Sequence, residues 1–234
     1  MIRTGYATRE GTALDNADSA SVYVLSDGTV GAAVIDGIGH GPHTSRTAPL
    51  LAETAARYSA HRGPLPGLLA AALLVADEGP DGEEADAVAV AARVDATGSH
   101  VAWVGDCRAY GWNGQTLTLH TTDHTMGEWV RTRLDGPPIE ISRPYDSWVR
   151  LSLSTATVAT THETDIPDPV LILVSDGVHD QVPADTLTAL ARAHADDPQT
   201  LATALVTAAT TDHTGYRDDA TAIVLTLPAH QHHA

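Results

Sequence analysis

Residues 29–42 read TVGAAVIDGIGHGP, and this stretch decides how the rest of the chain is interpreted. The run of small and β-branched apolar residues predicts a buried strand over residues 29–36. Asp36 ends that run, so it stands where a buried strand emerges from the core. A glycine-rich loop follows at residues 37–42, and apolar residues at helical spacing predict a helix over residues 43–60. The stretch therefore places a carboxylate at the rim of a sheet.

Four other short acidic motifs are scattered along the chain. They read NAD at residues 16–18, VGDCR at 104–108, LVSDG at 173–177 and RDDAT at 217–221. Asp106 and Asp176 again follow an apolar run directly. Strand ends that meet at one rim would build a cage of carboxylates, and these repel one another unless a hard cation lies between them. The motifs therefore predict a divalent-metal enzyme with oxygen ligands, Mg²⁺ or Mn²⁺ by preference.

The composition bounds the class of protein. A chain of 234 residues with 43% hydrophobic residues is long enough for one large domain, which we place at residues 1–228, before a His-rich tail at residues 229–234. No apolar run approaches the ~18 residues of a membrane span, and the start of the chain has no apolar signal core. We therefore expect a cytoplasmic protein without membrane contact, and a monomer. The net charge of −17 argues against nucleic acid as a partner. The one cysteine, Cys107, excludes an intramolecular disulfide.

The periodicity of apolar residues predicts strands, two helices, strands, two helices and a last strand. Turn signals at residues 26–29, 96–98 and 113–114 favour antiparallel pairing of the strands they join. We predict an α+β fold, a four-layer α-β-β-α sandwich of two packed antiparallel sheets flanked by helix pairs. A polar segment, residues 123–148, is predicted to be an irregular flap. The predicted strands are 2–8, 20–26, 29–36, 86–94, 99–106, 107–112, 116–120, 149–161, 170–175 and 220–227, and the predicted helices are 43–60, 65–77, 183–195 and 198–211.

In this order, the motifs resemble those of the protein phosphatase 2C (PPM) family of metal-dependent serine/threonine phosphatases, bacterial type. The segments WVGDCRAY at residues 103–110, TDHT at 122–125 and GYRDDAT at 215–221 extend the likeness, which runs from about residue 5 to residue 227. The resemblance implies the same sandwich and a hydrolase of signal transduction. Such an enzyme hydrolyses phosphoserine and phosphothreonine on phosphorylated protein substrates by a metal-activated water.

The resemblance also implies a set of ligands for two Mn²⁺ or Mg²⁺ ions. Asp36 would bridge the two ions, and the carbonyl of Gly37 would bind one of them. Asp176 and Asp218 would complete the second position. Asp36, Asp176 and Asp218 are thus the expected catalytic carboxylates.

Asp18 would act mainly through metal-bound water, and Asp106, with Asp176, would hold a third, weaker ion. Other interpretations of these motifs stay open at this stage. Asp106 could instead cap a turn or pair with Arg108. Residues 123–124 could merely start a helix of the flap, and Asp180 could be structural.

The chain departs from the family pattern near its start, where the family reads Arg-x-x-Asn-Glu-Asp. Here residues 13–18 read ALDNAD, so Ala13 replaces the arginine that would bind substrate phosphate and Ala17 replaces the glutamate. Arg9 or Arg46 could substitute, because a guanidinium grips phosphate from more than one direction. His40 could act as a general acid or be a solvated loop residue.

Two alternatives to a protein phosphatase follow from these departures. One is a catalytically weak phosphatase-like domain that regulates or binds phosphoproteins. The other keeps the chemistry and changes the substrate to a small phosphoester.

Overall fold

The computed structural model describes residues 1–39, 41–77, 85–133 and 142–228. His40, the His-rich tail and part of the predicted flap lie outside these ranges. Within them, the strands form two antiparallel sheets of five. The first sheet has the order β1 (Arg3–Arg9), β10 (Ala220–Thr226), β9 (Val170–Val174), β6 (Arg108–Trp112) and β7 (Leu117–Leu119). The second has the order β2 (Asp18–Val24), β3 (Val30–Ile38), β4 (Asp86–Asp95), β5 (Gly98–Val104) and β8 (His162–Ile166).

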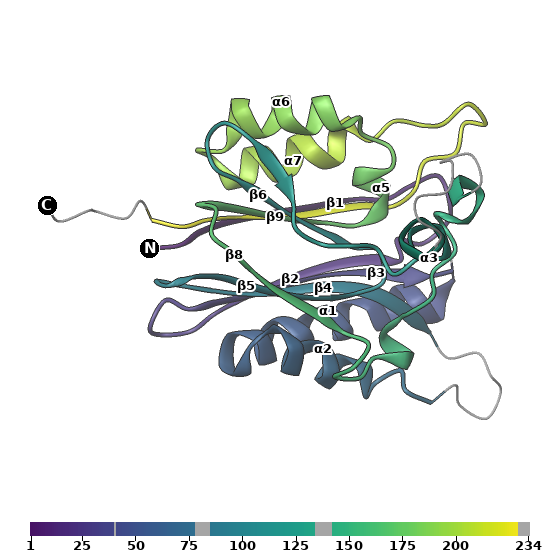
Figure 1. Cartoon of the computed structure of the whole chain (residues 1–234), viewed down its shortest axis with the longest axis horizontal. Coiled ribbons are helices and arrows are strands. Elements are labelled where there is room, and N and C mark those ends of the chain that lie inside the picture. The colour runs from purple at the N-terminus through teal and green to yellow at the C-terminus, as the bar shows by residue number, and fades with distance from the viewer. Residues whose placement is uncertain (40, 78–84, 134–141, 229–234) are drawn as a thin grey trace, which may run out of the picture.

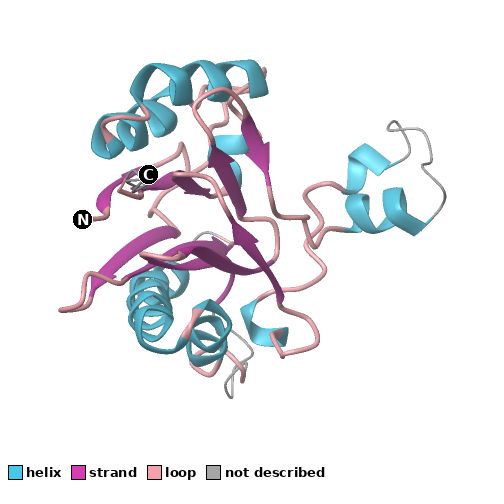
Figure 2. Cartoon of the chain, turned by 60° about the vertical axis from the view of Figure 1, so that its left-hand side comes forward, coloured by secondary structure: helices cyan, strands magenta, loops and turns pink. Residues whose placement is uncertain are grey.

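Helix pairs cover the outer faces of both sheets, as Figure 1 shows. The second sheet carries α1 (Pro42–Arg62) and α2 (Pro64–Ala72), and the first carries α6 (Ala184–His194) and α7 (Pro198–Ala208). The α+β, four-layer prediction is therefore confirmed. Helix α3 (Met126–Arg133) and the short turn η1 (Arg143–Tyr145) project from the sandwich (Figure 2). The remaining helical segments are α5 (Asp176–His179) and η2 (Leu153–Thr155). Across the described residues, we find no helix with the length and apolarity needed to cross a membrane.

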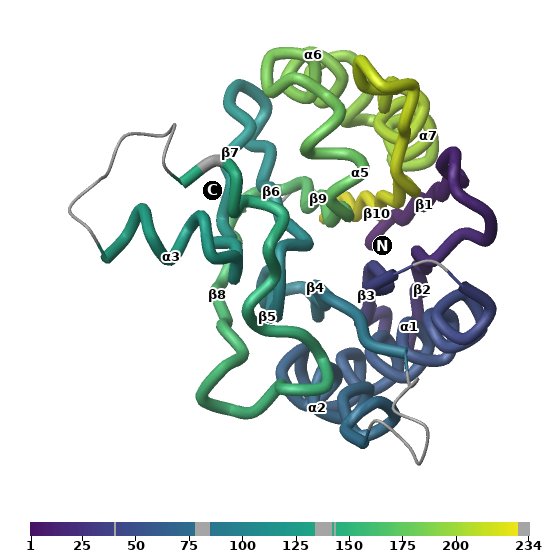
Figure 3. Tube along the Cα trace, turned by 90° about the vertical axis from the view of Figure 1, so that its right-hand side faces the viewer, coloured from purple at the N-terminus to yellow at the C-terminus, as the bar shows by residue number. Residues whose placement is uncertain are grey.

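Strand β3 is buried on both faces, which explains its continuous apolar run. Ala32 and Val34 pack between the two sheets, whereas Ala33 and Ile35 pack against α1 and α2. The strand therefore needs apolar side chains at every position instead of at alternate ones. Its far end lies with the ends of β2, β9 and β10 around one rim of the sandwich, seen face-on in Figure 3.

Helix α1 lies unusually close to β3 at Gly31. A Cβ atom added at Gly31 would lie 2.0 Å from the carbonyl oxygen of Ala56 and 2.5 Å from the nitrogen of Ala60. Glycine on the strand and alanines on the helix thus set the distance between these two layers.

The predicted strand 149–161 is wrong. The alternating apolar residues at 149, 151 and 153 do not line a sheet face, because Leu153 is fully buried as part of a helical turn against the α1–α2 core. Ser152 and Thr155 cap that turn reciprocally, and the Ser154 N–H donates to Asp86 (3.0 Å). These side-chain contacts take up backbone groups that a sheet ladder would have used.

The predicted strands 99–106 and 107–112 do not pair with each other. Strand β5 belongs to the second sheet and β6 to the first, so residues 105–107 cross from one sheet to the other. Gly105 makes the crossing with φ +92°, where a Cβ would lie 2.1 Å from a methyl carbon of Val88. The crossing places Asp106 between the sheets at the rim.

We expect Gly31→Ala to destabilise the fold by about 2 kcal/mol or more, because the added methyl meets backbone that cannot move alone. Urea denaturation measures the change. Gly41→Ala is the matched control: a Cβ there meets nothing within 4 Å, and its φ of 161° is extended. Equal stability of the two variants would contradict this account of the α1–β3 contact.

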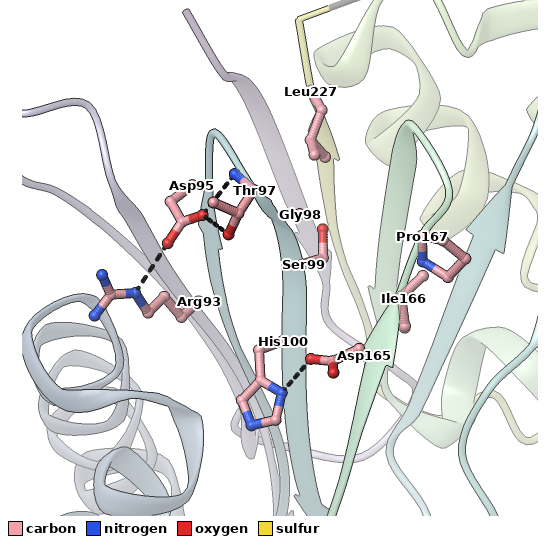
Figure 4. A pocket seen from close by; sticks show the side chains of 10 residues that line it. All are labelled: Arg93, Asp95, Thr97, Gly98, Ser99, His100, Asp165, Ile166, Pro167 and Leu227. Carbon is pink, nitrogen blue, oxygen red and sulfur yellow. Dashed lines mark hydrogen bonds and ion pairs between the residues drawn. The ribbon is translucent and has the colours of Figure 1, made fainter. Parts of the chain in front are cut away.

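His100 joins β5 to β8 at the end of the sandwich away from the rim. Its Nδ1 lies 2.7 Å from Asp165 Oδ1, drawn in Figure 4, and its Nε2 lies 3.0 Å from Glu163 Oε1. Partial burial lowers the pKa of His100, but the two carboxylates outweigh it and the pKa is raised above its ordinary value. Arg93 is its neighbour on β4 and is itself held by Asp95 (3.4 Å).

Because the folded pKa is raised, His100 should stabilise the fold fully below its unfolded pKa of about 6.5 and lose this effect as pH rises through the folded value. The side chain is 40% exposed, so we expect less than about 1 kcal/mol. The measurement is the difference in unfolding free energy between wild type and His100→Gln from about pH 5.5 to about pH 8.5. In a Glu163→Gln, Asp165→Asn background the pH dependence of that difference should vanish; its persistence would refute the assignment.

Candidate metal centre

The predicted ligands come from both sheets to the same rim. Asp18 starts β2 directly opposite Asp36 of β3 in the antiparallel register. Asp176 starts α5 just after β9, and Asp218 stands just before β10. Asp18 and Asp106 are buried, whereas the other three keep partial exposure.

Asp36 and Asp176 approach each other across the gap between the sheets, close enough for repulsion from Asp176 to affect the pKa of Asp36. Loss of hydration raises the pKa of Asp36 well above its ordinary value, and repulsion from Asp176, Asp18 and Asp106 adds to this. A cation placed between these carboxylates would relieve their repulsion.

Ser175 and Thr221 hold Asp18 in place. The Ser175 hydroxyl donates to Asp18 Oδ2 (2.6 Å) and accepts from the Thr221 N–H (3.0 Å). Burial raises the pKa of Asp18 well above its ordinary value, although the Ser175 hydrogen bond opposes the shift. Sequence reasoning gave these two residues no role; the available signal was that both lie inside the acidic motifs.

His179 connects Asp106 to α5. Its Nε2 donates to the Asp106 carbonyl (3.0 Å), its Nδ1 lies 2.9 Å from Asp180 Oδ1, and its side chain is only 2% exposed. Burial, with repulsion from Asp176, raises the pKa of Asp106 to about 7. Burial, with repulsion from Asp218, raises the pKa of Asp176 to about 6. In both cases His179 opposes the rise.

Asp219 ties down the loop between β1 and β2. Its two carboxylate oxygens accept from the Gly11 N–H and the Ala17 N–H, each at 2.7 Å, and the residue is 3% exposed. The Ala17 carbonyl in turn accepts from the Gly37 N–H (3.1 Å). Sequence reasoning assigned Asp219 no role, although the paired aspartates at 218–219 marked the position.

The two arginines predicted as possible phosphate ligands lie in different settings. Arg9 donates to the carbonyls of Val206, Thr207 and Ala209, at 3.4, 3.1 and 3.0 Å, and so caps the C-terminal end of α7. Arg46 is exposed on α1. His40, the predicted general acid, lies outside the described residues.

Arg108 and His124 secure the crossing that carries Asp106. Arg108 binds Asp123 through two hydrogen bonds, at 2.6 and 3.0 Å, and the structure gives this partner in place of Asp106. His124 Nδ1 accepts from the Gly105 N–H (3.2 Å), and the His124 N–H donates to the Gly105 carbonyl (2.9 Å). Burial lowers the pKa of His124 to about 4, so the ring is neutral and able to accept.

The donor set fits a hard divalent cation. All of its side-chain donors are carboxylate oxygens, and their mutual repulsion is what a cation would relieve. In the described residues, no three His, Cys, Asp or Glu side chains converge on a single point. The close contacts are pairwise, and Mg²⁺ is commonly held by one or two carboxylates while it keeps several waters.

One cavity of the structure lies away from this rim. It measures about 730 Å³ and lies by the β4–β5 turn, β8 and Leu227, which follows β10 (Figure 4). It contains none of the predicted site residues, so its size does not bear on the carboxylate chemistry.

Comparisons with known proteins agree in fold and not in overall sequence. No family model matches the chain, and no curated protein matches it. Many solved structures are similar, and the following three are among them. The serine/threonine phosphatase Stp1 from Staphylococcus aureus has a TM-score of 0.79 and 18% identity, covering 97% of this chain and 96% of that one. The PPM Ser-Thr phosphatase MsPP from Mycobacterium smegmatis, in complex with cacodylate, has 0.77 and 22%, covering 97% and 98%. The catalytic domain of the serine/threonine protein phosphatase PstP, in complex with two manganese ions, has 0.70 and 20%, covering 96% and 97%.

These matches span the whole sandwich, including both sheets and both helix pairs. The chain therefore has the fold of the bacterial PPM-type serine/threonine phosphatases over nearly its whole length.

Proposed function

We propose that this protein hydrolyses phosphoserine and phosphothreonine in proteins with the help of bound Mn²⁺ or Mg²⁺. The observation that carries the proposal is the approach of Asp36, near the end of β3, and Asp176, just after β9, so that carboxylates attached to the two different sheets repel each other at one rim. The fold shared with PPM-type phosphatases and the two manganese ions in the PstP structure support it.

In this proposal Asp36, the Gly37 carbonyl, Asp176 and Asp218 would hold two cations, with Asp36 as a ligand of both. When bound, the cations supply an acidified water and neutralise the phosphoryl oxygens. Asp106 and Asp176 would hold a third ion. The protein itself would hold the ligand oxygens in place before the substrate binds.

Asp18 would act on the cations indirectly, mainly through metal-bound water. Its carboxylate is oriented by Ser175, so it can accept a proton or a hydrogen bond from a water in the cluster. No nucleophilic side chain is needed, which agrees with Cys107 being fully buried with a raised pKa of its thiol.

Phosphate binding in this chain would depend on the cations more than on arginine. Ala13 cannot bind phosphate through its side chain, and Arg9 is engaged at the end of α7. Asp219 fixes the loop that carries Ala13, because its carboxylate binds the backbone N–H groups of Gly11 and Ala17, on either side of Ala13. We therefore propose weak ground-state binding of the phosphate alone, with Arg46 as a remaining candidate at the rim.

We expect Asp36→Asn to abolish Mn²⁺-dependent hydrolysis of p-nitrophenyl phosphate, lowering kcat/KM by about a thousandfold or more, because the bridging charge is lost. Asp27→Asn is the matched control. Asp27 lies in the β2–β3 turn, where it accepts from the Thr29 N–H (2.9 Å), a role that asparagine retains. Wild-type turnover by Asp36→Asn would rule this mechanism out.

The acidic cluster should also make the protein's stability depend on pH when a chelator is present. Asp106 and Asp176, with pKa values of about 7 and about 6, keep protons in the folded state that they lose when unfolded. The free energy of unfolding should therefore fall as pH rises from about 4 to about 7.

Asp176→Asn should remove part of this dependence and be more stable than wild type by about 1–3 kcal/mol near pH 8 in chelator. Excess Mn²⁺ should stabilise wild type and not the variant. Urea denaturation at several pH values, with chelator or Mn²⁺, provides the measurement. A variant less stable than wild type at every pH would show that the carboxylates do not repel one another.

A further inference from the structure

A cavity of about 480 Å³ opens beside the carboxylate rim. One wall is Ile38, the last residue of β3, which is 44% exposed. Residues two apart on a strand share a face, so Ile38 lies on the same face of β3 as Asp36. The rest of the lining is the segment 147–150 with Ser152 and Asp86, and the Asp86 carboxylate already accepts from the Ser154 N–H (3.0 Å) and the Ser154 hydroxyl (2.7 Å). Ile38 therefore places the cavity beside the end of β3 that carries Asp36.

Exposed aromatic rings border this cavity. Trp148 lines it and is 59% exposed, and its ring lies 6.0 Å from that of Tyr145. Trp129, on α3, is 37% exposed. Large aromatic side chains left in water are uncommon and mark places where a partner binds.

Two arginines stack on Trp129. The guanidinium carbon of Arg150 lies 5.5 Å from the ring centre and that of Arg133 lies 5.8 Å from it. Neither forms an ion pair with a described carboxylate, whereas Arg131 binds Glu128 at 2.9 Å. The stack therefore presents positive charge next to the cavity.

This positive charge stands out against the rest of the chain. The net charge is −17, so most of the surface would repel an acidic peptide. Arg150 lines the cavity and shares the Trp129 ring with Arg133. These two guanidinium groups therefore complement an anionic group of a partner.

We propose that the cavity lined by Ile38, Trp148 and Arg150 binds the acidic flank of a phosphorylated peptide whose phosphoresidue lies at the carboxylate rim. Arg150 would pair with an aspartate or glutamate of the peptide, and Trp148 would pack against an apolar neighbour. This inference rests on the proposed function and narrows it to acidic phosphoprotein segments.

The spacing fixes which peptide residue is contacted. Two residues of strand separate Asp36 from Ile38, or about 7 Å at the rise of a strand. An extended peptide advances about 3.3–3.6 Å per residue, so a side chain about two to four positions from the phosphoresidue would lie at the cavity.

The test is turnover of phosphothreonine peptides in which a single glutamate, or glutamine as its neutral match, is moved through the flanking positions. Wild type should prefer glutamate by about fivefold in kcat/KM at a position two to four residues from the phosphothreonine. Arg150→Gln should bring that ratio to about one. Trp148→Ala should lower kcat/KM for both peptides.

Arg192→Gln is the matched control, because Arg192 also stacks on a tryptophan, Trp112, at 6.0 Å, but lies on α6. It should leave the glutamate preference as in wild type. An equal loss of preference in both variants would assign the effect to net charge and overturn the proposal.

A binding measurement separates this inference from the proposed function. Fluorescence anisotropy with labelled peptides and the Asp36→Asn protein reports binding without turnover. Failure of wild type to hydrolyse any peptide or p-nitrophenyl phosphate would count against the proposed function alone. Equal affinity for glutamate and glutamine peptides, or no change on Arg150→Gln, would overturn the cavity's assignment.

Discussion

The mutual repulsion of carboxylates at one rim of the sandwich is the constraint on which the rest of the structure depends. Asp36 and Asp18 come from one sheet, and Asp176 and Asp218 from segments attached to the other. Carboxylates with strongly raised pKa values tend to move apart or to stay protonated. Only a rigid frame holds them together, and the tightly packed core between the two sheets supplies it.

The sequence predicted the parts of this frame that local patterns control. The continuous apolar run before Asp36, the turn at 26–29 and the order of strands and helices were enough for the four-layer fold. Local sequence patterns did not predict the parts of the structure that depend on contacts between residues far apart in the chain. Leu153 belongs to an alternating apolar pattern that is typical of a strand, yet it packs against the α1–α2 core. It does so because Asp86 and the Ser152 cap hold this segment in a helical turn.

The candidate site shows the same division. Aspartates at strand ends could be found in the sequence because an apolar run before a carboxylate is a local signal. The partners that orient them could not, because each acts across the fold: Ser175 on Asp18, His179 on the backbone of Asp106, and Asp219 on the β1–β2 loop. The residues of these three hydrogen bonds are 157, 73 and 202 positions apart in the sequence, so no local periodicity reveals them.

The replacement at Ala17 illustrates why such a site can keep its geometry while losing side chains. The resemblance expects a glutamate there, but the contacts that matter to the frame come from the backbone: the Ala17 N–H binds Asp219 and its carbonyl binds Gly37. A backbone contact survives a change of side chain at residue 17, whereas position 37 must stay glycine, since a Cβ there would lie 2.8 Å from the Ala17 carbonyl oxygen. The fold can therefore be shared at 18% identity with Stp1, because a fold requires close backbone contacts and small residues between layers more than particular side chains. Most other positions need only be apolar inside and polar outside, so they are free to diverge.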